Sequence, residues 1–274
     1  MPERDQEERP SSLPKSLSPS QIQEVLALHK VWVDSDGADG QRAVLAGTNL
    51  SRAELQDACL RNSDLKEATL SGARCQGADF SGANMQRARA YEANFRGANL
   101  SDVDLNGASL QRAVFQNANL RNAGMAPADL ELADLSGADL TGAQLVGANF
   151  ENANLREAVL CNADIRKARF REANLLSANL EGTNLRGADL RSANLQSTVL
   201  RKAILQSARL QDADLVKADL SGANLLKAKM QKTDLYKVNF EDADLRGADL
   251  REAVGFSQKH LDLAVTDDAT RIRD

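Results

Sequence analysis

Residues 133–145 read ADLSGADLTGAQL, and this five-residue unit continues without a break from Ala43 to Leu250. Every fifth residue from Leu45 to Leu250 gives 42 positions, of which 30 are Leu and most of the others are Phe or Met. Two residues earlier stands Ala in 35 units, and the residue between them is Asn or Asp in 26. The unit is therefore Ala-Asn/Asp-Leu-x-x, and a repeat of this length organises the whole chain.

A period of five does not fit either regular secondary structure. In an α-helix, five residues rotate by roughly 140°, so the Leu positions would form no single face. In a flat strand, an odd repeat would turn every second Leu to the opposite side. A short extended piece followed by a corner satisfies the pattern: Ala and Leu point inward, Asn or Asp points outward, and two residues turn the chain. The turn positions include several glycines, which tolerate positive φ: Gly47, Gly72, Gly97, Gly137, Gly187 and Gly247. Repeated corners of one hand wind a solenoid.

The Ala-Asn/Asp-Leu-x-x array resembles the pentapeptide repeat family of bacterial proteins over about three quarters of the chain. This resemblance implies an all-β solenoid, a right-handed quadrilateral β-helix with four units per coil. The 42 units would then make about ten coils, and strand spacing gives a rod about 50 Å long. Residues 20 apart would stack in ladders, with the β-helix spanning residues 43–255 and a short capping α-helix at each end.

Both flanks carry helix signals. Ser18 is a predicted N-cap, followed by Pro19 and by Gln21 three residues on. We expect residues 18–42 to form a capping helix and turn, preceded by a disordered polar tail over residues 1–17. After the repeats, Ser257 is the predicted N-cap of a short helix through about Val265, with Phe256 and Leu261 as a hydrophobic staple. Residues 256–274 are therefore expected to form a C-terminal capping helix and tail, and the helix offers a dimer surface if the protein is not a monomer.

Two units depart from the regular pattern. Ala90 occupies a Leu position, which predicts a local void or a tighter coil. Pro127 follows Gly124 in the same unit, which predicts a bend or an irregular turn. Cys59 and Cys161 lie on one face but five coils apart, too far for a disulfide.

Composition indicates the compartment. With no disulfide pairing, no secretory signal and no apolar run long enough to span a membrane, we expect a reduced, cytoplasmic protein without metal or cofactor.

The distribution of charge argues against imitation of DNA. The net charge of −5 arises in the flanks, because residues 41–250 contain 26 basic and 26 acidic side chains. Some proteins of the family imitate duplex DNA and bind DNA gyrase or topoisomerase, which confers quinolone resistance. Such imitation requires a continuous acidic surface. In this chain the repeats carry equal numbers of basic and acidic side chains, so such a surface is not expected.

Local charge nevertheless suggests candidate contact residues. One predicted ladder runs Glu131, Glu151, Arg171 and Arg191, and further basic residues lie beside it. Two interpretations remain open: a small basic patch for an acidic partner, or an ordinary surface on which Glu151 pairs with Arg171. Two outward tyrosines could also anchor a partner. The candidates are Arg166, Lys167, Arg169, Arg171, Arg186, Arg191, Tyr91 and Tyr236.

No motif for catalysis was found. The chain has two His, one in each predicted cap, and no phosphate-binding loop or metal-spaced cluster. The first hypothesis is therefore a non-enzymatic scaffold that binds an unknown protein. The second is a DNA-mimicking binder of gyrase or topoisomerase, and the third is an uncharacterised enzyme.

Overall fold

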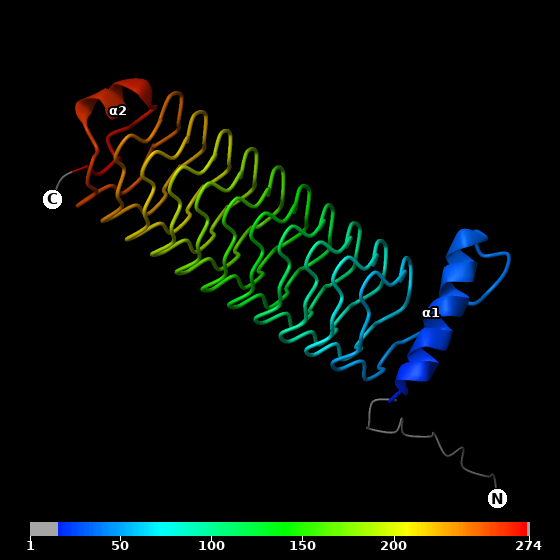
Figure 1. The fold of residues 1–274 in the computed structure, drawn as a ribbon. Helices are drawn as coiled ribbons and strands as arrows, with labels where there is room; N and C mark the ends of the chain where they lie inside the picture. The colour runs from blue at the N-terminus through cyan, green and yellow to red at the C-terminus, as the bar shows by residue number, and fades with distance from the viewer. Residues whose placement is uncertain (1–15, 273–274) are drawn as a thin grey trace, which may run out of the picture.

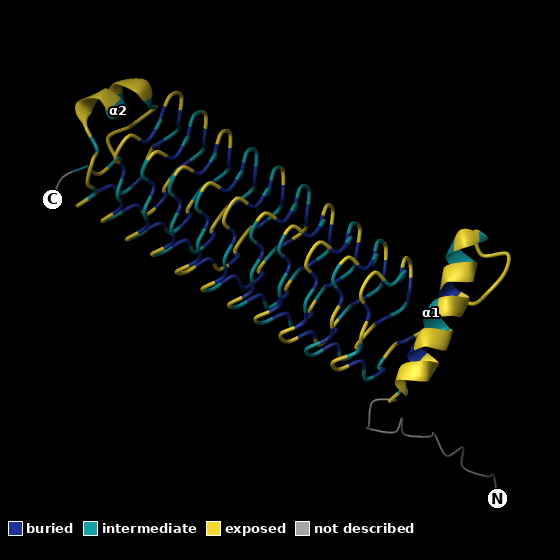
Figure 2. Ribbon diagram, in the orientation of Figure 1, coloured by how far each residue is buried: buried dark blue, intermediate teal, exposed yellow. Residues whose placement is uncertain are grey.

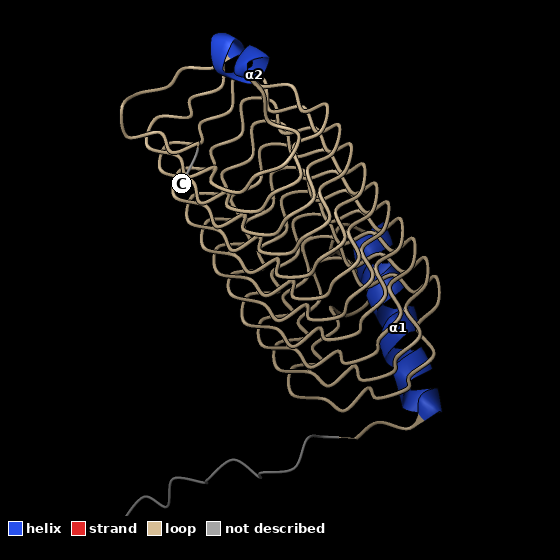
Figure 3. Cartoon of the chain, turned by 90° about the vertical axis from the view of Figure 1, so that its left-hand side faces the viewer, coloured by secondary structure: helices blue, strands red, loops and turns tan. Residues whose placement is uncertain are grey.

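The computed structural model describes residues 16–272. Two helices flank a long series of stacked coils: α1, Pro19–Asp34, stands across one end, and α2, Gln258–Leu263, lies at the other (Figure 1). Between them the chain winds in coils. The extended part of each unit is a single parallel bridge, and the described residues contain no strand longer than that. Figure 3 shows the coils stacked in register between the two helices.

Four units make one coil. Val44 bridges to Asp64, Asn49 to Thr69, Glu54 to Arg74 and Cys59 to Asp79, and the same separation of 20 residues continues along the rod. Each bridge uses two hydrogen bonds between adjacent coils, as where Leu65 N–H donates to the Asn84 carbonyl at 2.7 Å. The backbone is thus satisfied between coils, which explains how such short extended pieces persist.

Buried residues alternate with more exposed ones along the coils, as the repeat predicts (Figure 2). Ala and Leu positions are buried almost without exception, the first turn residue is mostly half-buried, and the second is largely exposed. Aromatic rings 20 residues apart stack inside the rod, with centroids 5.0 Å apart for Phe95 and Phe115 and 4.7 Å for Phe150 and Phe170. Around Ala90 the coil contains bulky Phe80 and Phe95, whose rings meet edge to face at 5.7 Å. The core is therefore a continuous apolar column.

The regular corners are β-turns closed by a hydrogen bond from the next Ala-position N–H to the preceding Leu-position carbonyl, as in Ala68 to Leu65 at 2.9 Å. The second turn residue has positive φ at the described turns from Gly47 to Glu252, except at Pro127. Proline fixes φ near −65° and has no N–H, so it cannot adopt this turn. The irregular turn predicted there is confirmed.

Asn106 compensates for the irregular turn. Its side-chain oxygen accepts the N–H of Ala126 at 2.7 Å. In a regular unit that N–H is accepted by the outward Asn or Asp, but here the outward residue is Gly124. A Cβ at Gly124 would lie 3.2 Å from the Asn106 amide nitrogen.

At the N-terminal end, the predicted capping box is present. Gln21 N–H donates to Ser18 Oγ at 3.3 Å, and Ser18 N–H donates to Gln21 Oε1 at 2.9 Å. The expected tail over residues 1–17 lies mostly outside the described residues. Its last two residues contradict the expectation, because Ser16 bridges to Asn49 and Leu17 packs against the core.

The C-terminal end also differs from expectation. The helix ends at Leu263, and Val265, expected within it, bridges to Asp244. Arg271 likewise bridges to Asp249. The chain after the helix thus returns to the solenoid as two further sides of a coil, while α2 occupies the place of a third. The sequence missed this because the returning segment carries no Ala-x-Leu unit.

Candidate interaction surface

The outward Asn and Asp side chains form ladders along the rod. Each oxygen accepts the N–H two residues later, as from Ser81 to Asp79 at 3.0 Å. The Asn amide then donates to the equivalent residue of the previous coil: Asn119 to Asn99 at 2.9 Å, and Asn99 to Asp79 at 3.0 Å. These contacts explain why the unit prefers Asn or Asp at this position. The sequence shows the preference, but its cause appears only when the coils are stacked.

A second contact rule joins the first turn residue to the outward residue of the next coil, 18 residues later. Gln111 donates to Asp129 at 2.7 Å, and Arg121 donates to Asp139 at 2.9 Å. Glu151 and Arg169 follow the same rule, with 3.7 Å between their charged atoms. Many polar side chains on the surface of the rod therefore form hydrogen bonds or ion pairs with other residues of the rod.

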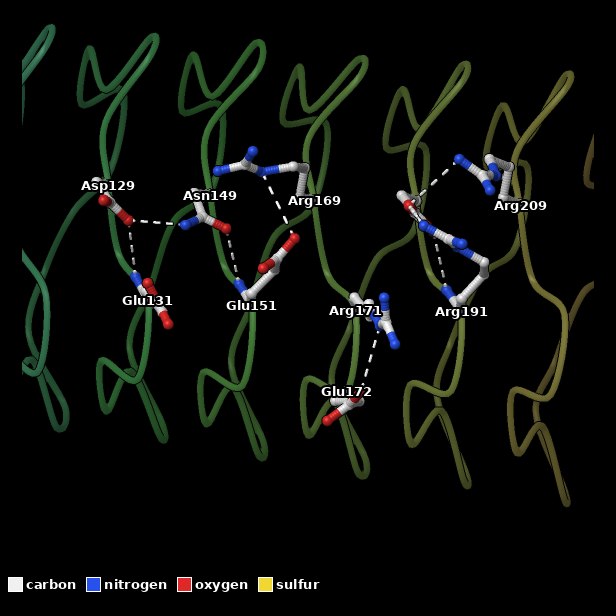
Figure 4. A network of polar contacts seen from close by, with 10 residues as sticks. Asp129, Glu131, Asn149, Glu151, Arg169, Arg171, Glu172, Arg191 and Arg209 are labelled. Atoms are coloured by element: carbon white, nitrogen blue, oxygen red, sulfur yellow. Dashed lines mark hydrogen bonds and ion pairs between the residues drawn. The ribbon is translucent and has the colours of Figure 1, made fainter.

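Three of the basic candidates, Arg169, Arg171 and Arg191, lie together on neighbouring coils of the rod (Figure 4). Arg169 is an outward residue of one side, and Arg171 and Arg191 stand one coil apart at its following corner. Arg166, Arg186 and Lys167 occupy turn positions before it. Tyr91 belongs to the same corner several coils earlier, whereas Tyr236 lies on a different corner.

The predicted pair between Glu151 and Arg171 is wrong. Glu151 contacts Arg169 instead, and Arg171 pairs with Glu172, beside it in the chain, at 3.2 Å (Figure 4). The side chain of a first turn residue contacts the outward residue 18 positions later more often than the equivalent turn residue 20 positions later. Contacts 20 apart form chiefly between outward residues.

Carboxylates within the patch neutralise much of its charge. Arg166 pairs with Asp164 at 2.7 Å, and Asp189 lies between Arg191 and Arg209, 3.6 Å from Arg209. The hydrogen bond from Arg166 is the main cause that lowers the pKa of Asp164. Burial raises the pKa of Asp189, but hydrogen bonds and the charge of Arg191 outweigh it and lower that pKa overall. The patch is thus largely paired internally, which disfavours a site for nucleic acid.

The two tyrosines differ in exposure. Tyr236 is 56% exposed and Tyr91 is 43% exposed. Lys237 lies over the Tyr236 ring at 5.3 Å from its centroid, a cation–π geometry. A hydrogen bond with Glu92 raises the pKa of Tyr91. Val254, 57% exposed, bridges to Asp234 and so extends the apolar surface near Tyr236.

Concave places occur on the coils and beside α2. A polar hollow of about 520 Å³ lies between Arg61 and Asp102. There Asp79 contacts Arg61 at 3.6 Å and accepts from Asn99, and Asp102 accepts from Asn122. A cavity of about 650 Å³ opens beside α2, lined by Leu250, Phe256, Leu261 and others. Within residues 16–272 no group of three or more His, Cys, Asp or Glu side chains could hold a metal ion.

Comparison with known proteins identifies the family. The family model for pentapeptide repeats, which describes eight copies, matches ten overlapping segments that run from residue 36 to residue 251. The chain belongs to the pentapeptide repeat family. Proteins of this family form right-handed quadrilateral β-helices, in agreement with the 20-residue period of the bridges. No curated protein matched the sequence.

Solved structures of the same family resemble the chain. HetL, a regulator of heterocyst differentiation from the cyanobacterium Nostoc sp. strain PCC 7120, is 30% identical over 81% of this chain and 95% of its own, with a TM-score of 0.42. Rfr23 from the cyanobacterium Cyanothece 51142 is 40% identical over 31% of this chain and 58% of its own, with a TM-score of 0.31. QnrB1, a plasmid-mediated fluoroquinolone resistance protein, is 22% identical over 73% of this chain and 90% of its own, with a TM-score of 0.34.

Proposed function

We propose that this pentapeptide repeat protein is a non-enzymatic scaffold that binds a partner protein along its flat faces. The observation that carries the proposal is the internal use of its polar groups. Outward Asn and Asp side chains bond to one another along the rod, and Arg side chains pair with neighbouring carboxylates. A rigid and balanced surface of this kind suits recognition by shape and by a few exposed anchors.

Tyr236 is the proposed anchor. Its exposed ring, the Lys237 ammonium above it and the nearby Val254 combine apolar area with polar groups, as interface centres do. The paired arginines, by contrast, would first have to break contacts within the rod.

The number of coils, the closing of both ends by helices, the dimer surface and the compartment are also part of the proposal. About ten coils form the rod, with α1 and α2 closing its ends, so that side faces remain the accessible surface. A dimer through α2 would bury Leu263 and Val265, which are 42% and 51% exposed. Three free cysteines, with Cys75 buried and its pKa raised by burial, support a reduced, cytoplasmic setting. In the described part of the chain, no helix has the length and apolarity needed to cross a membrane.

The test places a photo-crosslinking amino acid at position 236 of the full chain, with position 91 as the matched control. Both are tyrosines at the first turn position of a unit, on different corners. In lysate of the source cells, irradiated at low and at high salt, we expect one protein to crosslink at position 236 at both salt concentrations. Equal yields at both positions would contradict Tyr236 as the anchor. Gyrase subunits captured only at low salt would support DNA mimicry in place of the scaffold.

A further inference from the structure

One imidazole fastens α1 to the solenoid. His29 is completely buried, and its Nδ1 accepts the backbone N–H of Ala43 at 3.0 Å. In the regular units the N–H of the Ala position donates to a Leu carbonyl three residues earlier. Ala43 belongs to the first unit and has Gly40 at that place, so the His29 nitrogen substitutes for the missing carbonyl. His29 also stacks on Trp32, with centroids 5.6 Å apart.

This contact requires a neutral ring. Neutral imidazole can accept through one nitrogen, whereas the protonated ring has two donors and no acceptor. After protonation, a buried cation would face the Ala43 N–H, which would lose its partner. Such an arrangement is costly inside a protein.

The surroundings of His29 do little to stabilise a positive charge on its ring. Burial lowers the pKa of His29, the positive charge of Arg42 lowers it further, and the carbonyl of Arg61 raises it. On α1 itself, Lys30 is paired with Asp34 at 2.8 Å. Arg42 and the Arg61 carbonyl act on the ring directly. The other titratable and charged groups of α1, the following turn and the facing first coil include Lys30, Asp34, Asp36 and Cys59.

We propose that α1 is an acid-releasable cap, held on the first coil by neutral His29. Its release would uncover Leu45 and Leu50, which are buried in the first coil, and would free the backbone edge at Asn49. The outward side of this edge has no preceding coil, and Ser16, which bridges to Asn49, would leave with the helix. Free strand edges pair with other extended chains. Acid would therefore convert a closed end into one that can bind a strand, without requiring the rod to unfold.

His260 provides a matched comparison at the other end. Its Nδ1 accepts the Ser257 N–H at 2.9 Å, but it is partly exposed. The Ser257 hydroxyl also lies 2.9 Å from Nδ1 and can accept from the protonated ring. Protonation there keeps one hydrogen bond, so His260 is not a comparable latch.

The test is hydrogen exchange of the α1 amides in the full chain at about pH 7.5 and about pH 5, corrected for intrinsic rates. If His29 takes up its proton only when α1 is open, the equilibrium constant for opening of α1 rises by at most about tenfold for each pH unit below the unfolded-state pKa of about 6.5. We expect this loss of protection in the wild type and in His260→Asn. In His29→Asn, where the amide oxygen can accept from Ala43 without titrating, protection should stay constant.

Unchanged protection of wild-type α1 at the two pH values would overturn the proposal, as would an equal loss in His29→Asn. If that variant lacks protection at both pH values, nitrogen NMR of the wild-type imidazole decides. The proposal requires an unprotonated Nδ1 at neutral pH and a titration midpoint that coincides with the loss of α1 protection. Any other tautomer or a separate midpoint contradicts it.

Discussion

At the scale of single residues, the second turn position accepts many residue types although its backbone conformation favours Gly. The second turn residue needs positive φ, and many such positions carry side chains, among them Arg52, Lys167 and Leu132. Each side chain there costs energy that Gly would avoid. The solenoid tolerates the cost because hydrogen bonds between coils fix each turn.

Leu132→Gly should stabilise the protein by about 1 kcal/mol, the αL cost minus the extra entropy of Gly in the unfolded chain. Leu132 has φ of 60° and is 45% exposed, so little packing is lost. The measurement is the denaturation midpoint. Glu131→Gly, at the preceding turn position, is the control and should not stabilise. A lower midpoint for Leu132→Gly would show that its side chain packs more than its exposure indicates.

Asn106→Ala should destabilise the protein by about 1–2 kcal/mol, because Ala126 N–H would lose its acceptor in a turn that Pro127 already weakens. Asn106→Asp keeps the accepting oxygen and should remain close to wild type. Thermal unfolding of the three proteins compares them. Equal losses in both variants would mean that the amide nitrogen, and not the oxygen, carries the contact.

At the scale of elements, the ladders and the caps show where sequence reasoning succeeds and stops. The repeat frame predicts which residues are inward, and Ser18 with Gln21 predicts the start of α1, because both signals are local. Contacts across coils depend on the register of segments 18 or 20 residues apart. That is why the stacking of residues 20 apart is predicted, whereas the hydrogen bonds within the Asn ladders and the partner of Arg169 are not. The return of Val265 and Arg271 to the last coil depends on free edge groups, which the residues themselves do not display.

The ladder predicts the effect of one added charge. Asn154 donates to Asp134 at 3.0 Å, so Asn154→Asp would set two carboxylates against each other. The repulsion should cost about 1 kcal/mol at neutral pH and raise the pKa of the new carboxyl. Stability should therefore recover as pH falls toward about 4, where that carboxyl takes up a proton. Asn152→Asp, in the neighbouring exposed turn, is the control. A loss independent of pH would implicate the missing donor alone.

At the scale of the whole molecule, the rod and its caps should respond to acid in different ranges. Hydrogen bonds from Arg166, Arg246 and Arg251 are the main causes that lower the pKa of Asp164, Asp244 and Asp249 below the ordinary value of 3.8. A lowered folded pKa contributes stability above the ordinary value, and this stability is lost as pH falls through the folded value. His29, also lowered, loses its contribution below 6.5.

Circular dichroism of the coils should thus remain constant from neutral pH to about pH 4 and decline only below it, after α1 has opened. Asp164→Asn removes one of these carboxylates and should make the decline shallower while lowering stability at neutral pH. A decline of the coil signal between about pH 6 and 5 would show that opening an end unravels the stack, as nearest-neighbour coupling allows. Constancy of the signal there would show that coil-to-coil hydrogen bonds hold the rod without its cap, so that an open end can persist long enough to pair with another chain.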